Sequence, residues 1–463
     1  MTRISRRAML AGLGVGLLGS VQMGAHAARR RPNIIFILAD DLGYGDLGCY
    51  GQTRVQTPNI DQMAREGMRF TDAYAGSTVC APSRCCLMTG QHTGHALVRG
   101  NALVPLRDGE VTVARVLKEA GYVTGLVGKW GLGEPGSTGL PRKQGFDSFF
   151  GYLNQRNAHS YYPPFLWRNE AREPLEGNVE VRYNVAEQRS QYSHDLFTKE
   201  ALAFIERERA KPFFLYLAYT IPHANNERGG ASGHGMEVPS RGRYEHEDWP
   251  DPQKCHAAMI SRLDRDVGRL FEHLRRLGLD DDTIVFFSSD NGPHKEGGAD
   301  PTFFESAGPL RGLKRDLYDG GIRAPFIVRW PGHVPAGEVT GHCCAFWDFL
   351  PTAADLAGAK IPEGLDGISI LPTLRDRPRR QKQHEYLYWE FHEGAYKRAI
   401  RIGHHKAVLI NEGPLEIYDL NTDLGERTDI AGQHPDLAAK YLAIIEGART
   451  DSEHWPGKIP PPR

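Results

Sequence analysis

The stretch NIIFIL at Asn33–Leu38, followed at once by Ala39-Asp40-Asp41, decides the fold. Its apolar residues run on without the alternation of a half-exposed strand, which is typical of a parallel strand buried on both faces. Three more runs have this character and also end at polar residues: Tyr122–Val127 before Lys129, Pro212–Tyr219 before His223, and Thr283–Ser289 before Asp290-Asn291. The sequence therefore predicts buried strands that deliver polar side chains at one end.

Helical patterns separate these strands along the chain. Capping residues and glycines bound them, and they cover Asn59–Glu66, Val111–Ala120, Ser193–Arg209 and Cys255–Arg276. Alternating strands and helices predict an α/β fold with a doubly wound, mixed but mostly parallel sheet flanked by helices. In such sheets the ligand site lies at the carboxyl ends of the strands, so the polar residues named above are expected to converge there.

The pattern changes after about residue 375 of the 463. Residues 384–410 alternate apolar and polar side chains, as half-exposed antiparallel strands do, and a helix is expected at about Pro435–Arg449. We therefore predict a main α/β domain over residues 30–375 and a small C-terminal α+β subdomain with an antiparallel sheet over residues 376–463.

Residues 1–27 have the order of a signal peptide. Arginines at positions 3, 6 and 7 precede an apolar run, Ala8–Val21, and the small-residue triplet Ala25-His26-Ala27 follows. The adjacent arginines resemble a twin-arginine signal, so the hypothesis is export by the twin-arginine (Tat) machinery to the periplasm or the cell exterior. The apolar run is shorter than the ~20 residues that span a bilayer, so no stable membrane anchor is expected.

The composition disfavours several classes of protein. The 56 basic and 57 acidic side chains balance, so no net charge attracts nucleic acid. The seven cysteines are odd in number and include two adjacent pairs, which gives no evident disulfide framework. No Cys-x-x-Cys pair occurs, which disfavours a thiol oxidoreductase.

Four residues at the strand ends offer oxygen ligands: Asp40, Asp41, Asp290 and Asn291. An all-oxygen set suits a hard cation, Ca²⁺ or Mg²⁺, rather than zinc. Either pair alone would be an ordinary set of turn residues. Both pairs together, after buried strands, favour a metal site, with calcium preferred over magnesium.

The stretch CAPSRCCLMTG, at Cys80–Gly90, holds three of the seven cysteines. Pro82 is expected to begin a helix, which puts Cys80 just before the helix N-terminus, where thiolates and anions are favoured. Arg84 falls on the first turn. Cys85 and Cys86 lie inside the helix and are expected to pack in the core.

This stretch resembles the signature of the type I, formylglycine-dependent sulfatases of the alkaline phosphatase superfamily: Cys-x-Pro-Ser-Arg, then Leu-x-Thr-Gly. Two further segments, NIIFILADDLGYGDLGCYG and TIVFFSSDNGPHKEGG, resemble the metal motifs of this arylsulfatase-like family. YLAYTIPHA resembles the segment with the sulfate-binding histidine, at His223, and LRGLKRDLYDGGIRAPFIVRWPG resembles the catalytic-lysine segment, at Lys314. The resemblance covers nearly all of the chain after the signal peptide and implies an alkaline-phosphatase-like fold.

The resemblance also implies hydrolysis of sulfate esters. In this family a separate maturase reads Cys-x-Pro-x-Arg, present here from Cys80 to Arg84, and oxidises the cysteine to formylglycine. The formylglycine hydrate joins the metal ligands and attacks sulfur. Arg84, Lys129 and Lys314 would surround the sulfate oxygens, and His223 would protonate the departing alcohol.

One position departs from the family pattern. The segment GKWGLG keeps Lys129 but has Gly131 where the resemblance implies a histidine that contacts the formylglycine hydroxyl. His159 could supply the missing imidazole, or it could be an ordinary loop residue. Arg99, His159 and His294 are also candidate substrate contacts.

Export and aromatic residues such as Tyr161-Tyr162 and Trp167 favour a sulfated carbohydrate as substrate, because aromatic rings stack on sugar faces. A small aryl sulfate is a further candidate. Two alternatives stay open at this point: a phosphate or phosphonate ester hydrolase of the same fold, and a non-catalytic protein that binds sulfated glycans.

Overall fold

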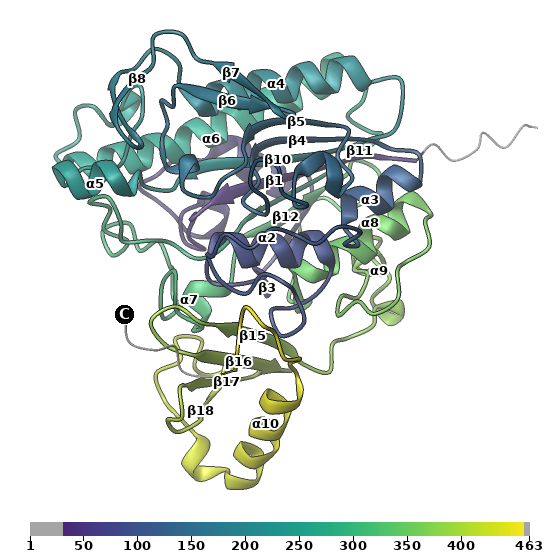
Figure 1. Ribbon diagram of the computed structural model, residues 1–463. Coiled ribbons are helices and arrows are strands. Elements are labelled where there is room, and N and C mark those ends of the chain that lie inside the picture. Colours follow the sequence, from purple (N-terminus) through teal and green to yellow (C-terminus); the bar gives the residue numbers. More distant parts are fainter. Residues whose placement is uncertain (1–30, 458–463) are drawn as a thin grey trace, which may run out of the picture. The chain divides into compact units, whose positions relative to one another are not determined.

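The computed structural model describes residues 31–457, so the predicted signal peptide lies outside the described residues. A ten-stranded sheet forms the centre of this part of the chain (Figure 1). In sheet order its strands are β13 (Glu338–Thr340), β2 (Met68–Phe70), β12 (Phe326–Arg329), β11 (Thr283–Ser289), β1 (Asn33–Asp40), β10 (Phe213–Pro222), β4 (Val123–Lys129), β5 (Ser148–Tyr152), β6 (Phe165–Arg168) and β7 (Ala171–Pro174).

The five central strands, from β11 to β5, run parallel to one another. Every residue of β1, β10 and β11 is buried, because continuous apolar runs are covered on both faces. Ile35 of β1 pairs with Leu215 of β10 and with Val285 of β11, so these strands end close together. Antiparallel strands flank the parallel centre on both sides, which confirms the predicted mixed, mostly parallel sheet.

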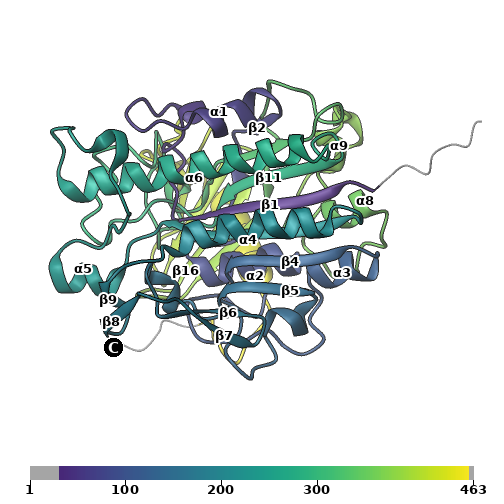
Figure 2. The same cartoon turned by 90° about the horizontal axis from the view of Figure 1, so that it is seen from above.

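Helices cover both faces of the sheet (Figure 2). On one face, α1 (Pro58–Arg65), α4 (Ser193–Glu208) and α6 (Asp251–Arg276) share a hydrophobic core with Ile35 and Ile37. On the other face, α2 (Cys80–Thr89), α3 (Val113–Glu119) and α8 (Phe349–Ala357) share a core with Ile34 and Phe36. Successive residues of β1 thus face opposite cores, as the pleat of a strand requires.

The helix ends lie within a few residues of those predicted. Helix α3 begins two residues late, after Thr112, whose hydroxyl accepts a hydrogen bond from the backbone N–H of Arg115. Helix α6 begins four residues early, at Asp251. Pro252 lies in its first turn, where no intrahelical N–H is needed.

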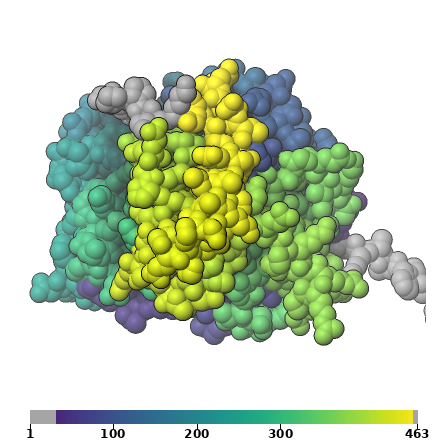
Figure 3. Space-filling model, turned by 90° about the horizontal axis from the view of Figure 1, so that it is seen from below, coloured from purple at the N-terminus to yellow at the C-terminus, as the bar shows by residue number. Residues whose placement is uncertain are grey.

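A second, four-stranded antiparallel sheet follows, with the order β15-β16-β17-β18. The α10 helix packs on this sheet through Tyr441 and Ile445, and the whole segment extends across one face of the molecule (Figure 3). The predicted antiparallel subdomain is confirmed, but its boundary at residue 375 stays a prediction, because the described residues form one compact unit. The bounds are β15 (Leu387–Phe391), β16 (Lys397–Ile402), β17 (His405–Ile410), β18 (Glu416–Asp419) and α10 (Pro435–Gly447).

The shorter elements connect these layers. They include β3 (Ala73–Tyr74), β8 (Val179–Arg182), β9 (Val185–Gln188), β14 (Cys344–Ala345), α5 (Asn226–Ser232), α7 (Asp319–Ile322) and α9 (Leu371–Leu374). No helix within residues 31–457 combines the length and the apolar character that crossing a membrane requires. All seven cysteines lie in this part of the chain and are free thiols there.

Candidate active site

Polar side chains converge at the carboxyl ends of the central strands, as the sequence predicts. They are Asp40 and Asp41 at the end of β1, Lys129 at the end of β4, His223 after β10, and Asp290 and Asn291 after β11. Each is at most 2% exposed. Asp41 has a left-handed backbone (φ 66°), which aspartate tolerates better than most residues. Its backbone N–H donates to Asp290 Oδ1 at 3.1 Å, which ties two of the strand ends together.

Cys80 is the first residue of α2, and Val79 is the N-cap. The helix therefore begins two residues earlier than predicted, and Cys80 lies in the helix rather than before it. Its Sγ donates to Asp40 Oδ1 at 3.3 Å. Burial, and then the negative charge of Asp40, raises the pKa of the thiol well above its usual value. The expectation of a favoured thiolate is thus wrong, and the unmodified thiol is a poor nucleophile.

Arg84 and Lys129 hold two of the carboxylates. Arg84, one turn along α2 from Cys80, donates to Asp290 Oδ2 at 2.8 Å and to Asp40 Oδ2 at 3.3 Å. Lys129 Nζ donates to the same Asp40 oxygen at 2.6 Å. Burial alone would raise the pKa of Asp40, but the nearby positive charges, Lys129 first, hold that pKa well below its usual value. Asp40 is therefore ionised.

His223 and Lys314 form a proton-bearing pair. His223 Nδ1 lies 2.6 Å from the carbonyl oxygen of Ala224, so Nδ1 carries the hydrogen. The free Nε2 lies 3.0 Å from Lys314 Nζ, which also donates to Asp41 Oδ2 at 2.8 Å. Burial, followed by the charge of Lys314, lowers the pKa of His223 to about 3. The neutral imidazole of His223 thus accepts, at Nε2, a hydrogen bond from the charged ammonium group of Lys314.

The oxygen-rich edge of the site fits a hard cation. Asn291 Nδ2 donates to Asp41 Oδ1 at 2.7 Å, and Asn291 Oδ1 is buried with no hydrogen-bond donor among residues 31–457. Burial, and then the charge of Asp40, raises the pKa of Asp290 to about 7, as expected where carboxylates crowd together with too little positive charge. A compact group of potential ligand atoms, all within 4.8 Å of one another, comes from Asp40, Asp41, Cys80 and His223.

Two of the three candidate substrate contacts lie beside His223. The ring of His159 stacks on that of His223 with 4.8 Å between centroids, and its Nδ1 lies 3.0 Å from Glu227 Oε2. The ring of His294 lies 5.9 Å from that of His223, and its Nε2 is 3.1 Å from the carbonyl oxygen of Pro222. Both histidines are therefore near the proton-bearing pair.

Arg99 is not brought to the other site residues. It is buried, and its guanidinium donates to Glu390 of β15 at 2.8 Å and to the carbonyl oxygen of Thr450 at 3.0 Å. Its Nε donates to the carbonyl oxygen of Ala96. This guanidinium therefore joins the catalytic part of the chain to the C-terminal sheet.

The space beside Gly131 is taken by Gln155. A Cβ at Gly131 would lie 2.4 Å from Gln155 Oε1, whereas His159 pairs with Glu227. Gln155, rather than His159, therefore lies at the position of the missing side chain, and a chemical role of the His159 imidazole stays a prediction. Gln155 lies in the loop after β5, which pairs with β4, and this pairing is the signal that could have pointed to it.

Glu227 and Glu296 also escaped the sequence analysis. Glu296 Oε2 lies 3.5 Å from Lys314 Nζ, and Oε1 lies 2.6 Å from Arg315. Its position inside the second metal-motif segment could have marked it. Glu227 lies in the short α5 helix, and no local pattern connects it with His159.

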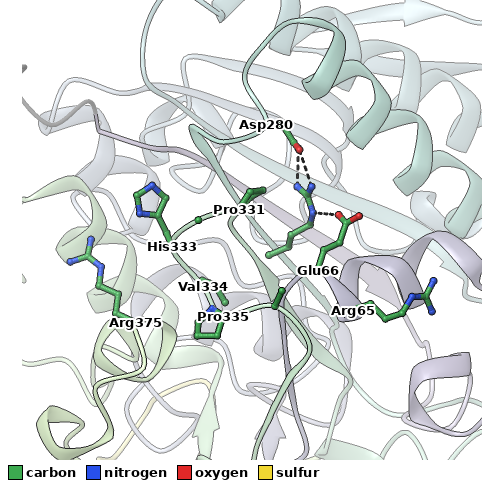
Figure 4. Close-up of a pocket in the computed structure, with 11 residues that line it drawn as sticks. Arg65, Glu66, Asp280, Pro331, His333, Val334, Pro335 and Arg375 are labelled. Atoms are coloured by element: carbon green, nitrogen blue, oxygen red, sulfur yellow. Dashed lines mark hydrogen bonds and ion pairs between the residues drawn. The ribbon is translucent and has the colours of Figure 1, made fainter.

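A cavity of about 630 Å³ lies at the opposite edge of the sheet (Figure 4). Its lining includes Glu66 before β2, Asp280 before β11 and Arg329 at the end of β12. Arg329 contacts Glu66 at 2.6 Å and Asp280 at 2.8 Å, so the protein itself neutralises its charge. The amino ends of the parallel strands therefore carry a structural ion cluster, and the candidate active site lies at the carboxyl ends.

The fold and the site define a hydrolase with an alkaline-phosphatase-like architecture, and comparison with known proteins agrees. The chain belongs to the sulfatase family, which it matches over residues 32–359. Residues 313–442 match the family described as N-sulphoglucosamine sulphohydrolase, C-terminal. The protein is therefore a sulfuric ester hydrolase.

Relatives and solved structures span most of the chain. Arylsulfatase A of Homo sapiens is 34% identical over 505 aligned residues, which cover 95% of this chain and 90% of the relative. N-acetylgalactosamine-6-sulfatase of Homo sapiens is also 34% identical and covers 83% of this chain and 73% of its own length. A crystal structure described as Ps i-CgsB in complex with k-i-k-neocarrahexaose matches with a TM-score of 0.78 and 28% identity, over 93% of this chain and 95% of that one.

Proposed function

We propose that this sulfatase hydrolyses sulfate esters of carbohydrates, with a formylglycine made from Cys80 and a bound Ca²⁺. The environment of Cys80 carries the proposal. Its Sγ lies 3.3 Å from Asp40 Oδ1 in a buried, charged site, where the raised pKa makes the thiol a poor nucleophile. Oxidation to the aldehyde removes that difficulty, because the hydrated aldehyde supplies an oxygen nucleophile.

Three cations are arranged to meet the charge of the sulfate group. Lys129 Nζ, Lys314 Nζ and the Arg84 guanidinium all contact the carboxylates around residue 80. Negative charge that develops on sulfate oxygens there is met by fixed positive groups in a site closed to bulk water. His223 and Lys314 hold a proton between Nζ and Nε2 at 3.0 Å, and this pair supplies a proton to the departing alcohol oxygen.

The metal ligands would be Asp40, Asp41, Asp290 and Asn291, with residue 80 after its modification. The unpartnered Oδ1 of Asn291 and the raised pKa of Asp290 support a cation at this edge. The oxygen-only donor set supports calcium over zinc. When bound, the cation supplies Lewis-acid stabilisation of the ionised nucleophile and of the sulfate oxygens.

The mass of one peptide tests the proposal. Trypsin releases residues 70–84, FTDAYAGSTVCAPSR, whose single cysteine is Cys80. In protein that hydrolyses 4-nitrophenyl sulfate, this peptide should show the mass of the aldehyde form and should react with an aminooxy probe. Fully active protein in which the peptide keeps its thiol would contradict the proposal. A host without a formylglycine-generating maturase should yield inactive, thiol-containing protein.

The names of the relatives support a sulfated carbohydrate as the substrate. One relative is an N-acetylgalactosamine-6-sulfatase, and a matching structure holds a neocarrahexaose. The test compares kcat/KM on sulfated oligosaccharides from glycosaminoglycans and carrageenans with kcat/KM on 4-nitrophenyl sulfate. We expect at least one oligosaccharide to be preferred. A preference for the aryl sulfate over every oligosaccharide would contradict the carbohydrate assignment.

Export by the twin-arginine route accompanies this proposal. The Arg6-Arg7 pair precedes the apolar run Ala8–Val21, and the small-residue triplet Ala25-His26-Ala27 follows it. Replacement of both arginines by lysine should leave the activity in the cytoplasmic fraction, whereas the parent protein should be recovered outside the cytoplasm. Equal export of both proteins would contradict the twin-arginine assignment.

A further inference from the structure

Gly131 lies two residues after Lys129, and the Gln155 side chain occupies the space beside it. The backbone N–H of Gly131 donates to the carbonyl oxygen of Leu153 at 3.1 Å, so the segments after β4 and β5 still run side by side. An ideal Cβ at Gly131 would lie 2.4 Å from Gln155 Oε1 and 3.9 Å from Arg84 Cδ. A side chain at position 131 and the observed Gln155 side chain therefore exclude each other.

Hydrogen bonds fix the orientation of the Gln155 carboxamide. The backbone N–H of Ala81 donates to Asn101 Oδ1 at 3.1 Å, which identifies that atom as the amide oxygen. The Gln155 group 3.4 Å from the same oxygen must then be the NH₂ end. Gln155 Oε1 consequently faces the space beside Gly131, and the whole carboxamide is anchored to the backbone that directly follows residue 80.

Gln155 Oε1 is a buried acceptor that lacks a donor. The residue is 8% exposed, and no donor to Oε1 occurs within the described part of the chain. Arg84 is close by, but its nitrogens donate to Asp290 and to the carbonyl oxygen of Lys129. Buried carbonyl oxygens are nearly always paired in folded proteins. Gln155 Oε1 is therefore free to accept a hydrogen bond from a reacting group.

We propose that Gln155 is a positioning residue of the active site, whose Oε1 accepts a hydrogen bond from a hydroxyl of residue 80 in its hydrated aldehyde form. The inference rests on the proposed function. The carboxamide takes the space of the imidazole that Gly131 lacks, but an amide oxygen binds no proton at neutral pH. Gln155 therefore orients the hydroxyl without acting as a general base, and it adds no imidazole pKa to the pH profile.

The test is a pair of variants in one loop. Gln155→Met keeps the length of the side chain and removes the acceptor. Asn154→Ala is the matched control, because both ends of the Asn154 amide already have partners: its NH₂ group donates to Glu134 at 2.8 Å, and its Oδ1 accepts from the backbone N–H of Arg156 at 2.7 Å. Loss of one hydrogen bond is expected to lower kcat about tenfold with KM nearly unchanged, and the control should retain parental values.

A second readout does not depend on turnover. A hydrogen bond to the hydrate favours it over the free aldehyde, so the Gln155→Met protein should react with an aminooxy probe at residue 80 several times faster than the control. Gln155→His restores an acceptor and should recover part of kcat, now with an acid limb near the imidazole pKa of about 6.5.

The outcomes separate this inference from the proposed function. If Gln155→Met changes only the melting temperature, with kcat and probe labelling as in the control, Gln155 is structural and the inference is wrong. If the active parent protein keeps its thiol in peptide 70–84, the proposed function itself is wrong, whatever the variants show.

Discussion

Two buried charged clusters of this sulfatase use their polar atoms in opposite ways. The joint between the main sheet and the C-terminal sheet is built on Glu390 of β15. Glu390 Oε1 accepts hydrogen bonds from Arg99 at 2.8 Å and from His392 at 3.0 Å, and Oε2 accepts from Tyr388 at 2.9 Å and Arg449 at 3.0 Å. Both oxygens of this carboxylate are saturated.

The active site, in contrast, keeps acceptors without donors. Asn291 Oδ1 and Gln155 Oε1 are buried and have no donor in residues 31–457. Burial would raise the pKa of Glu390, but His392 and Arg99 lower it to about 2, whereas burial and Asp40 raise the pKa of Asp290 to about 7. The charged groups of the joint are thus paired with one another and stabilise the fold. The active site instead keeps unpaired polar atoms that can bind a ligand.

The largest effect is expected from the removal of the nucleophile precursor. Cys80→Ala should lower kcat by about 10⁴–10⁶-fold, as loss of a nucleophile does in other hydrolases. Its melting temperature should stay within a few degrees of the parent, because the thiol has a single hydrogen bond.

Cys85→Ala is the matched control for this variant. It removes another buried thiol of α2, so it should cost about 1 kcal/mol of stability and leave kcat intact. Comparable losses of kcat in both variants would mean that the α2 helix had been damaged rather than the chemistry of residue 80. The assignment of the active-site cluster to catalysis and of the joint to stability would then lose its support.

The second effect falls on the joint. Glu390→Gln leaves the guanidinium groups of Arg99 and Arg449 without their carboxylate, which should reduce the free energy of unfolding by about 3–5 kcal/mol. The kcat of the folded protein should stay unchanged. Denaturant unfolding measures the loss, and Glu363→Gln, at an exposed ion pair with Lys360, should change stability by less than about 1 kcal/mol.

The same variant makes a prediction about pH. Because the pKa of Glu390 is lowered from 4.5 to about 2 on folding, its stabilisation is complete above the unfolded pKa and is lost as pH falls toward 2. The difference in unfolding free energy between the parent and Glu390→Gln should therefore be constant above about pH 6 and shrink below about pH 5. A difference that grows on acidification would contradict the assigned pKa.

The two clusters also differ in how far the sequence predicts them. Asp40, Lys129, His223 and Asp290 follow continuous apolar runs, and the carboxyl ends of parallel strands must meet at one edge. That rule is geometric, so the convergence of the site could be predicted. The outer strands of the sheet are harder to predict from the sequence, because short antiparallel strands such as β6 and β7 show little alternation of apolar and polar residues.

Arg99 and Gln155 show where sequence reasoning ends. The sequence makes Arg99 a candidate substrate contact, yet in the structure it binds Glu390, which is 291 residues away in the chain. Gln155 fills the space beside Gly131 only because the segment after β5 runs alongside the segment after β4. Contacts of this kind depend on tertiary packing, and no local period or spacing encodes them.

The third effect concerns calcium and tests whether the unpaired polar atoms of the active site bind a cation. After chelation, added Ca²⁺ should raise the free energy of unfolding by about 2.7 kcal/mol at a concentration of 100 Kd. Asp290→Ala should abolish this increase, whereas Glu390→Gln should retain it. Stabilisation by Zn²⁺ but not by Ca²⁺ would contradict the oxygen-ligand assignment, and calorimetric melting curves with each ion decide between them.

The smallest effect is expected at His159. Its ring stacks on that of His223 with an interplanar angle of 17°, and its Nδ1 is held by Glu227 at 3.0 Å. His159 thus supports the orientation of His223 but does not contact the His223–Lys314 proton. An aromatic pair contributes about 0.5–1.5 kcal/mol, so His159→Ala should lower kcat roughly three- to tenfold, and His159→Phe, which keeps the stack, should recover most of this loss.

The double variant Gly131→His with His159→Ala distinguishes a positioning role of His159 from a direct role in the reaction. A histidine at position 131 would meet Gln155 Oε1 and would have to adopt φ +79°, which is strained for any residue with a Cβ. Gly131→His should therefore lower stability and fail to restore the kcat of His159→Ala. If it does restore kcat, or if His159→Ala costs more than 100-fold and His159→Phe brings no recovery, the imidazole of His159 takes part in the chemistry, and the active site would have one more reacting group than its hydrogen bonds indicate.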